Sequence, residues 1–267
     1  MGSAKGKGPV LERRNAAVVG LGQLGRVTAE GLLSSGWTVT GYRRHEDDYE
    51  TLDNVQLAVI ATGEDDLLST LSSTPRSWRD SKTVLLQNEL LPAQWQSCHV
   101  VDPTIFIVWF SKKPGQTIRE YRPSLLFGPR SKEMAMAMEM VGVETEFIPN
   151  EEELITALIT KNTYIWTQNI VSLAVADPLA SSVLNQYRNT FDSIISEVIA
   201  TQELSVGIRI NRESVTKEVL EVISKDGDKK LGGRTARARL QRLLKLASSV
   251  QLDAPTLLSI EAELSPL

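Results

Sequence analysis

Three glycines near the start of the chain have the spacing of a dinucleotide-binding loop. The segment Gly20-Leu21-Gly22-Gln23-Leu24-Gly25 reads GxGxxG, follows an apolar run and opens a helical pattern. In such a loop the first glycine forms a tight turn, the second lets backbone N–H groups approach a pyrophosphate, and the third lets the helix pack on the sheet. The helix N-terminus adds unpaired N–H donors and partial positive charge. We expect Gly20, Gly22, Gln23, Leu24 and Gly25 to bind a cofactor; a ligand-free glycine turn is the alternative.

Two arginines follow the second predicted strand, where NAD enzymes usually place an acid that binds the ribose. The strand ends in Gly41-Tyr42-Arg43-Arg44. Because guanidinium groups match a phosphate bidentately, Arg43 and Arg44 favour the 2′-phosphate of NADP. Tyr42 or Arg43 could also stack on adenine. Alternatively, both arginines are solvated and balance Glu46–Asp48, and one of those acids could return to the ribose of NAD.

Two further strand ends carry candidate ligand-binding residues. Ala61 and Thr62 end the third apolar run, and Asn88 follows the fourth, Thr83–Gln87. Since ligands bind at the carboxyl ends of the strands in such a sheet, we predict that Ala61 and Thr62 contact the cofactor. Asn88 could hydrogen-bond the nicotinamide ribose or a substrate carbonyl. A helix cap or a turn is the other explanation for this asparagine, and its position does not decide between them.

Lys161 lies in an unusually apolar helical stretch. It shares one helix face with Ile165 and Asn169, at i, i+4 and i+8 spacing. A lysine in such a stretch either extends its ammonium group to solvent or is functional. A carbonyl that accepts a hydride needs a proton donor for the forming alkoxide, and a partly desolvated ammonium group can supply that proton.

The elements around these residues divide into two parts. Up to about residue 150, apolar runs at 16–19, 37–42, 56–61 and 83–87 alternate with helical stretches such as 23–35, which predicts a parallel sheet. Further strands are expected at 100–101, 104–110, 124–127 and 143–148. Beyond residue 150, helices are expected at 151–175, 181–206, 212–224, 235–250 and 255–264, with a charged, glycine-rich loop at 225–233.

The predicted fold class is therefore α/β: a Rossmann-type dinucleotide-binding domain followed by an all-helical C-terminal domain. The domains are expected as a flexible tail over residues 1–14, an NADP-binding Rossmann domain over 15–149, and a helical substrate and dimerisation domain over 150–267.

Composition excludes several classes of protein. The chain has 267 residues, 42% hydrophobic and 23% charged, which is typical of a globular protein. A net charge of −4 and the lack of a long apolar run predict neither a nucleic-acid partner nor a membrane span. With one cysteine, Cys98, and two histidines, His45 and His99, we expect no metal site; a lone cysteine is compatible with the cytoplasm.

The chain resembles the ketopantoate reductase family, two-domain NADP-dependent enzymes that reduce a 2-oxo acid. The glycine loop matches, and Leu86-Gln87-Asn88 is similar to the family's Leu-x-Asn-Gly segment. The stretch from Thr160 to Asn169 is similar to its Trp-x-Lys-Leu-x-x-Asn-x-x-x-Asn helix, and Asp253-Ala254-Pro255 to the join of its last two helices. The resemblance implies that Lys161 is the general acid, that Asn88 contacts cofactor and substrate, and that Asn169 binds polar groups of the substrate.

Four positions depart from the family pattern. Ile165 replaces the helix's first asparagine, Thr62 replaces a strand-end lysine, and Glu89 replaces the glycine after Asn88. The family's substrate-binding carboxylate would fall near Gly233–Arg237, which contains no acid. Its loss, together with Arg237 and Arg239, suggests a more anionic substrate or a loss of the chemistry; a solvated basic helix face is the alternative reading of the arginines.

These observations predict an NADPH-dependent reductase of a 2-oxo acid or related carbonyl, acting on a small molecule as a cytoplasmic homodimer. The predicted catalytic residues are Lys161, Asn88 and Asn169. One alternative is an NADP-binding sensor or regulatory protein without turnover. Another is a 3-hydroxy-acid-type dehydrogenase, in which Lys161 would act as a base.

Overall fold

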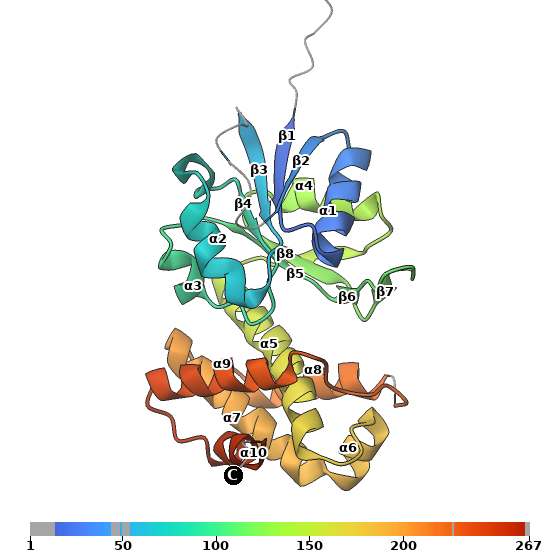
Figure 1. The fold of residues 1–267 in the computed structure, drawn as a ribbon, viewed down its shortest axis with the longest axis vertical. Coiled ribbons are helices and arrows are strands. Elements are labelled where there is room, and N and C mark those ends of the chain that lie inside the picture. The colour runs from blue at the N-terminus through green and yellow to red at the C-terminus, as the bar shows by residue number, and fades with distance from the viewer. Residues whose placement is uncertain (1–13, 44–48, 50–53, 226, 265–267) are drawn as a thin grey trace, which may run out of the picture. The chain divides into compact units, whose positions relative to one another are not determined.

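The computed structural model describes residues 14–43, 49, 54–225 and 227–264 (Figure 1). Most of the expected tail lies outside this part of the chain, as do Arg44 and Glu46–Asp48. The chain forms two compact units, the first from Met1–Leu86 and Cys98–Phe147 and the second from Gln87–Ser97 and Ile148–Leu267. The segment Gln87–Ser97, which the expected domain boundaries include in the Rossmann domain, thus packs with the helical unit.

A seven-stranded sheet forms the centre of the first unit, in the order β2-β1-β3-β4-β5-β8-β9. Strands β2 to β5 are parallel, β8 is antiparallel to β5, and β9 is parallel to β8. The strands of this sheet are β1 (Asn15–Val19), β2 (Thr38–Tyr42), β3 (Val55–Ile60), β4 (Thr83–Leu85), β5 (Thr104–Ile107), β8 (Ser124–Phe127) and β9 (Thr145–Phe147). A separate two-stranded sheet consists of β6 (Phe110–Ser111) and β7 (Arg119–Glu120).

Helices cover both faces of the large sheet. They are α1 (Gln23–Ser34), α2 (Leu67–Ser73) and α4 (Ser131–Glu139), with short 3₁₀ turns η2 (Glu64–Asp66) and η3 (Arg76–Trp78). Helices α1 and α4 pack against each other on one side, and α2 lies on the other (Figure 1).

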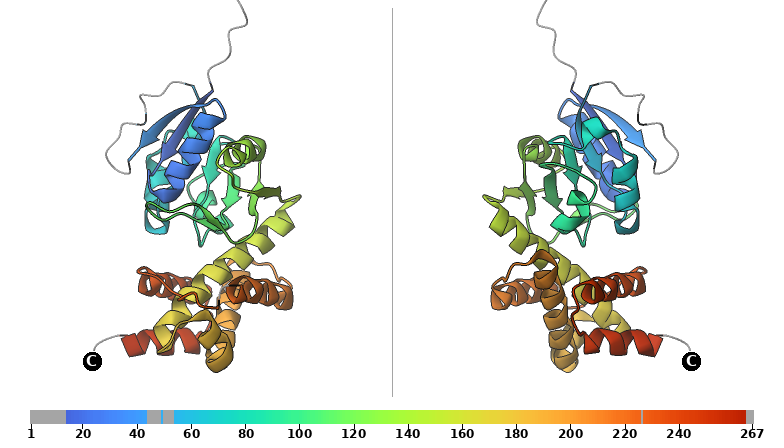
Figure 2. Two further views of the ribbon diagram at one scale, coloured as in Figure 1. Left: turned by 90° about the vertical axis from the view of Figure 1, so that its right-hand side faces the viewer. Right: turned by 90° about the vertical axis from the view of Figure 1, so that its left-hand side faces the viewer.

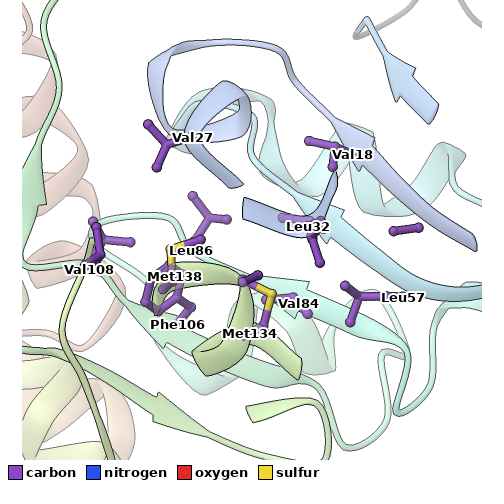
Figure 3. Packing of buried hydrophobic residues seen from close by; sticks show 14 of the residues in the cluster. Val18, Val27, Leu32, Leu57, Val84, Leu86, Phe106, Val108, Met134 and Met138 are labelled. Atoms are coloured by element: carbon purple, nitrogen blue, oxygen red, sulfur yellow. The ribbon is translucent and has the colours of Figure 1, made fainter. Parts of the chain in front are cut away.

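The hydrophobic core explains why the strands are apolar on both faces. Val18, Leu57 and Phe106 pack with Leu32 of α1 and Met138 of α4 (Figure 3). The alternate residues of the same strands are also buried, among them Ala17, Val19, Ala58, Ile60 and Ile105. Strands buried on both faces read as continuous apolar runs, which is the pattern that predicted them.

The second unit is helical. Its helices are α3 (Pro92–Gln96), α5 (Glu151–Ala174), α6 (Ala180–Gln186), α7 (Arg188–Val206), α8 (Arg212–Ser224), α9 (Ala236–Ser249) and α10 (Pro255–Leu264). Helices α7, α8 and α9 pack around α5 (Figures 1 and 2). Asn150 caps α5 by accepting a hydrogen bond from the Glu153 N–H at 2.9 Å. The predicted fold class, a Rossmann-type domain followed by a helical domain, is confirmed.

Two predicted elements are divided in the structure. The expected strand 104–110 splits because β5 pairs with β4 and β8, whereas β6 pairs with β7 in another sheet. The expected helix 181–206 splits at Tyr187 into α6, which packs on α8, and α7, which packs on α5. Tertiary packing decides both breaks, and neither has a glycine or proline to mark it.

The expected strand at Val100–Val101 is wrong. His99 and Asp102 have positive φ angles of 57° and 50°, so the backbone turns on both sides of the two valines. Val100 is buried for packing, while Val101 is exposed and donates its N–H to the Arg79 carbonyl oxygen at 3.1 Å.

None of the helices that the structure describes is both long and apolar enough to cross a bilayer. Within residues 14–43, 49, 54–225 and 227–264, no group of three or more His, Cys, Asp or Glu side chains is arranged to hold a metal ion.

Candidate functional site

The glycine loop lies where the strand order of the sheet reverses. Strand β1 has β2 on one side and β3 on the other, and ligands of open α/β sheets bind at such a point. The Gly20 N–H donates to the Tyr42 carbonyl at 2.9 Å, and the Ala61 N–H donates to the Val19 carbonyl at 2.7 Å. The ends of β1, β2 and β3 therefore adjoin at one edge of the sheet.

Close packing explains two of the three loop glycines. A Cβ atom on Gly20 (φ 94°) would lie 2.7 Å from the Ala61 carbonyl oxygen, and one on Gly25 would lie 1.9 Å from the Gly20 carbonyl oxygen. A Cβ atom on Gly22, the N-cap of α1, would meet nothing within 4 Å. Packing within the protein does not require Gly22, whereas the close approach of a pyrophosphate would. The residues present therefore fit a dinucleotide.

The other predicted cofactor residues, two at the start of α1 and two after β3, have side chains in different surroundings. Leu24 and Ala61 are half-buried and pack on the hydrophobic core, so only their backbone groups can serve a ligand. Gln23 is half-buried in the first turn of α1, and Thr62 is buried beside Ala61. In the part of the chain that the structure describes, no side chain caps α1, and its first turn contains no acid. The positive end of the helix is thus not countered by a carboxylate of that turn.

At the end of β2, Tyr42 and Arg43 lie in different surroundings. The Tyr42 ring is buried, with centroids 5.2 Å from Tyr49 and 5.9 Å from Trp78. Arg43 is exposed, directly after the strand. Of the two residues considered for adenine stacking, only Arg43 is accessible. Arg44 lies outside the described residues.

Lys161 is buried in the helical unit, with 7% of its surface exposed. Its Nζ lies 5.4 Å from the ring centroid of Tyr164, one turn further along α5. A lysine that extended to solvent would leave much more of its surface exposed. The structure therefore places an ammonium group in a largely desolvated position against an aromatic ring.

The segment after β4 brings Asn88 to the helical unit. Asn162 of α5 donates through Nδ2 to the Leu90 carbonyl at 3.0 Å, which ties the segment to that helix. Asn88 is half-buried, and Glu89 after it has a φ of 62°. A non-glycine residue is strained in this region, which explains why the similar family segment has glycine at this position.

Two arginines of α9 bind the carboxylate of Glu89. Arg242 donates from Nε to Oε2 at 2.7 Å and from Nη2 to Oε1 at 3.0 Å, and Arg239 donates from Nη1 to Oε1. Glu89 is 4% exposed and Arg239 9% exposed. Glu89, Arg239 and Arg242 thus form an ion-pair cluster within the second unit.

The two arginines considered for binding a more anionic substrate, Arg237 and Arg239, lie in different surroundings. Arg239 is paired with Glu89 inside the unit. Arg237 is half-exposed and contacts Glu261 at 3.5 Å, which fits the solvated helix face considered as the alternative.

Asn169 is partly engaged within α5. Its Nδ2 donates to the Ile165 carbonyl at 2.8 Å, and its Oδ1 lies toward Gly233, where a Cβ atom would be 3.4 Å away. The predicted catalytic residues Lys161, Asn88 and Asn169 all belong to the second unit. The described cofactor-binding candidates other than Asn88 belong to the first.

Sequence reasoning missed the partners of these residues. Lys229 donates to the Tyr164 hydroxyl at 3.0 Å, across 65 positions of the chain. Glu89 and Arg239 are 150 positions apart. The one local signal was the three-residue spacing of Lys161 and Tyr164, which places them on the same helix face.

Solved structures of known proteins share this fold. No family model matches the sequence, and no curated protein matches it. Among solved structures, 2-dehydropantoate 2-reductase from Methylococcus capsulatus has a TM-score of 0.70 at 16% identity, over 94% of this chain and 95% of that chain. Dimeric ketopantoate reductase from Staphylococcus aureus has a TM-score of 0.61 at 16% identity, over 94% and 97%.

A third structure belongs to an enzyme with a different activity. D-mandelate dehydrogenase, solved with NADH and anilino(oxo)acetate, has a TM-score of 0.65 at 12% identity, over 92% of this chain and 96% of that chain. The chain thus has the fold of the ketopantoate reductases, and the resemblance suggested by its sequence is confirmed at the level of the fold.

Proposed function

We propose that this protein is a reductase of 2-oxo acids that uses NADPH. The observation that carries the proposal is Lys161, a buried ammonium group on the central helix of a chain that also has a dinucleotide-type glycine loop. The neighbours in fold support it, since their names describe 2-dehydropantoate reduction and mandelate dehydrogenation.

In this proposal the first unit holds the cofactor. Backbone N–H groups around Gly22 and the N-terminus of α1 bind the pyrophosphate, and Arg43 binds the 2′-phosphate. Ala61 and Thr62 line the end of β3, next to the loop. When bound, NADPH supplies the hydride that reduces the substrate carbonyl carbon.

Lys161 supplies the proton. As the carbonyl carbon accepts the hydride, negative charge develops on its oxygen, and the ammonium group donates a proton to it, so that a 2-hydroxy acid forms. Burial of Lys161 limits competing hydration of the charge, and the Tyr164 ring holds the ammonium group in place. Asn88 orients the cofactor and substrate by hydrogen bonds.

A binding protein without turnover is the second candidate. It is favoured by a departure from the family pattern: Glu89 stands where the similar family has glycine, and its carboxylate is bound by Arg239 and Arg242. An assay of NADPH oxidation separates a binding protein from an enzyme.

The test is NADPH oxidation with a panel of aliphatic and aromatic 2-oxo acids. We expect turnover, and Lys161→Ala should lower kcat by about 10²–10⁴-fold. Lys217→Ala, which changes an exposed lysine of α8, is the control and should be unchanged. Turnover that survives Lys161→Ala would refute the proton-donor role, and NADPH binding without turnover would favour the second candidate.

The preference for NADPH over NADH needs its own measurement. Arg43→Ala should weaken NADPH binding by about 10- to 100-fold, the expected loss of a charged hydrogen bond, and NADH binding by much less. Isothermal titration with both nucleotides gives the comparison. Equal losses would remove the role of Arg43 at the 2′-phosphate.

A homodimer is also part of the proposal. The neighbouring ketopantoate reductase from Staphylococcus aureus is described as dimeric. Light scattering after gel filtration should give a particle of twice the 29.5 kDa chain mass. A particle of single-chain mass would contradict this, and the cytoplasmic location stays a prediction.

A further inference from the structure

The residues that follow Asn88 are held in a defined backbone path. Glu89 has a φ of 62°, and its carboxylate is bound by two arginines of α9. The Leu91 N–H, at the start of α3, donates to Gln94 Oε1 at 2.7 Å. Leu90, between these two anchored positions, is buried. We name the segment Asn88–Leu91 the Asn88 turn.

Asn162 joins the Asn88 turn to the helix that carries Lys161. Its Nδ2 donates to the Leu90 carbonyl oxygen at 3.0 Å, and both residues are 1% exposed. Asn162 directly follows Lys161 in α5, and Leu90 is two positions after Asn88. Consecutive Cα atoms are about 3.8 Å apart, so the Asn88 Cα is at most about 7.6 Å from the Leu90 Cα. One buried hydrogen bond therefore ties the position of Asn88 to that of Lys161.

Loss of this bond would act on the backbone of the Asn88 turn. Without the Asn162 amide, the buried Leu90 carbonyl is deprived of that donor, and a buried acceptor without its donor is costly. The turn would then shift toward another donor or toward water. A shift of about 1 Å in a group that orients reactants can lower a rate by about 10²-fold.

The next residue of α5 offers a matched control. Thr163 Oγ1 accepts from Gln202 Nε2 of α7 at 3.0 Å, and both residues are buried. This bond has the same length and the same kind of donor as the bond of Asn162. It joins α5 to α7, so Gln202→Met removes a buried amide donor without removing a bond of the Asn88 turn.

We propose that Asn162 is a positioning residue for Asn88. It acts through the Leu90 carbonyl and keeps Asn88 in register with Lys161, so that the Asn88 amide orients cofactor and substrate while the ammonium group serves the substrate carbonyl oxygen. The inference rests on the proposed function, which assigns the roles of Asn88 and Lys161. Asn162 itself contacts neither cofactor nor substrate in this arrangement.

A double-mutant cycle of Asn162→Leu and Asn88→Ala tests the inference in the full chain. Alone, Asn162→Leu should lower kcat/KM for a 2-oxo acid by about 10- to 100-fold. It should also weaken NADPH binding, titrated calorimetrically, by about three- to tenfold. With Asn88→Ala already present, Asn162→Leu should change either quantity by less than about twofold, because a positioning residue acts through the group that it positions. Gln202→Met should lower stability in urea but leave kcat/KM unchanged.

Hydrogen exchange of the free protein gives a readout that needs no ligand. Asn162→Leu should speed exchange of the amides in the Asn88 turn, and Gln202→Met should not. Urea unfolding checks that each variant is folded. Asn162→Ser, which is smaller, replaces Asn162→Leu in every measurement if the leucine variant is unfolded.

The inference is overturned if the effects of Asn162→Leu and Asn88→Ala are additive, or if Gln202→Met lowers kcat/KM as much as Asn162→Leu does. Turnover of a 2-oxo acid with additive effects would remove the positioning role and keep the reductase. Non-additive effects on NADPH affinity, in a protein that oxidises no NADPH, would keep the positioning role of Asn162 and refute the reductase.

Discussion

Two pairs of basic side chains lie in the helical unit, and their partners differ in charge. Arg239 and Arg242 surround the carboxylate of Glu89. Lys161 and Lys229 contact Tyr164, a neutral side chain. In the first pair a carboxylate of the protein accepts the hydrogen bonds, whereas the acceptors named for Lys229 are the neutral oxygens of Tyr164 and Gln168.

The difference shows that the number of basic residues in a segment does not identify an anion site. The stretch Arg234–Arg242 is rich in arginine, yet its buried members are committed to Glu89 by fork-like hydrogen bonds. The lysines provide a more compact charge with rotatable donors. The following predictions test this division between the arginines at Glu89 and the lysines at Tyr164.

The largest effect on stability is expected from Glu89→Ala. Removing the carboxylate leaves Arg239 and Arg242 partly buried without it, and breaking a buried ion pair in this way costs about 3–5 kcal/mol. Because the Arg242 side chain is 25% exposed, we expect about 3 kcal/mol. Urea unfolding measures the change. The control is Glu261→Ala, which removes the partner of the half-exposed Arg237 and should cost less than about 1 kcal/mol. Similar losses in both variants would mean that the Glu89 cluster is not structural.

Tyr164→Phe tests the contacts of Lys161 and Lys229 in the same way. It removes the hydroxyl that accepts from Lys229 but keeps the ring beside Lys161. Since no buried carboxylate is removed, stability should fall by only about 1–2 kcal/mol, as measured by urea unfolding. Tyr121→Phe, whose hydroxyl contacts Ser111 Oγ at 3.1 Å, is the control for loss of a phenolic hydroxyl. A loss as large as that of Glu89→Ala would contradict the division.

Local patterns predicted the elements and the residues that act through their own backbone. The glycine loop and the first four strands follow from patterns of neighbouring residues in the sequence, whereas the apolar stretch around Lys161 left open whether its ammonium group extends to solvent. The breaks in 104–110 and at Tyr187 depend on which element each half packs against. Such information is not contained in a local window.

The pairings within the helical unit were beyond local reasoning for the same reason. The partner of Glu89 is 150 positions away, and that of Tyr164 is 65 positions away. A sequence shows that Glu89 stands where a similar family has glycine, but not that its carboxylate meets Arg239. It likewise shows a charged loop around Lys229 without the helix face that the loop covers.

Glu89→Gly separates backbone strain from charge in the arginine cluster. Glycine adopts the φ of 62° without the penalty of a Cβ atom, which is about 1–2 kcal/mol. Both Glu89→Gly and Glu89→Ala remove the carboxylate, so Glu89→Gly should be the more stable of the two by about 1 kcal/mol. The difference between their urea unfolding free energies measures the strain. Equal stabilities would mean that the ion pair does not hold a strained backbone.

A third ion pair joins Glu203 and Arg212. We expect its removal to have the smallest effect on stability, and we expect that effect to depend on pH. Burial raises the pKa of Glu203. Hydrogen bonds from the Arg212 side chain and the Ile210 N–H, together with the charges of Arg212 and Arg209, lower the pKa by more than burial raises it, so it lies below its usual value. Since its pKa is lower in the folded state, the stabilisation is present above the unfolded pKa of about 4.3 and is lost as the pH falls through the folded value.

Glu203→Gln should therefore lower stability at pH 7 by less than about 1 kcal/mol, because Arg212 is half-exposed. The difference in unfolding free energy between Glu203→Gln and wild type should disappear at pH values below about 4. Unfolding in urea at both pH values measures it, with Asp192→Asn, in the exposed pair with Arg188, as the control. A gap that stays constant would mean that the carboxylate charge is not what stabilises this junction. Carboxylate-centred pairs would then differ among themselves, and the contrast with the lysines at Tyr164 would rest on the Glu89 variants alone.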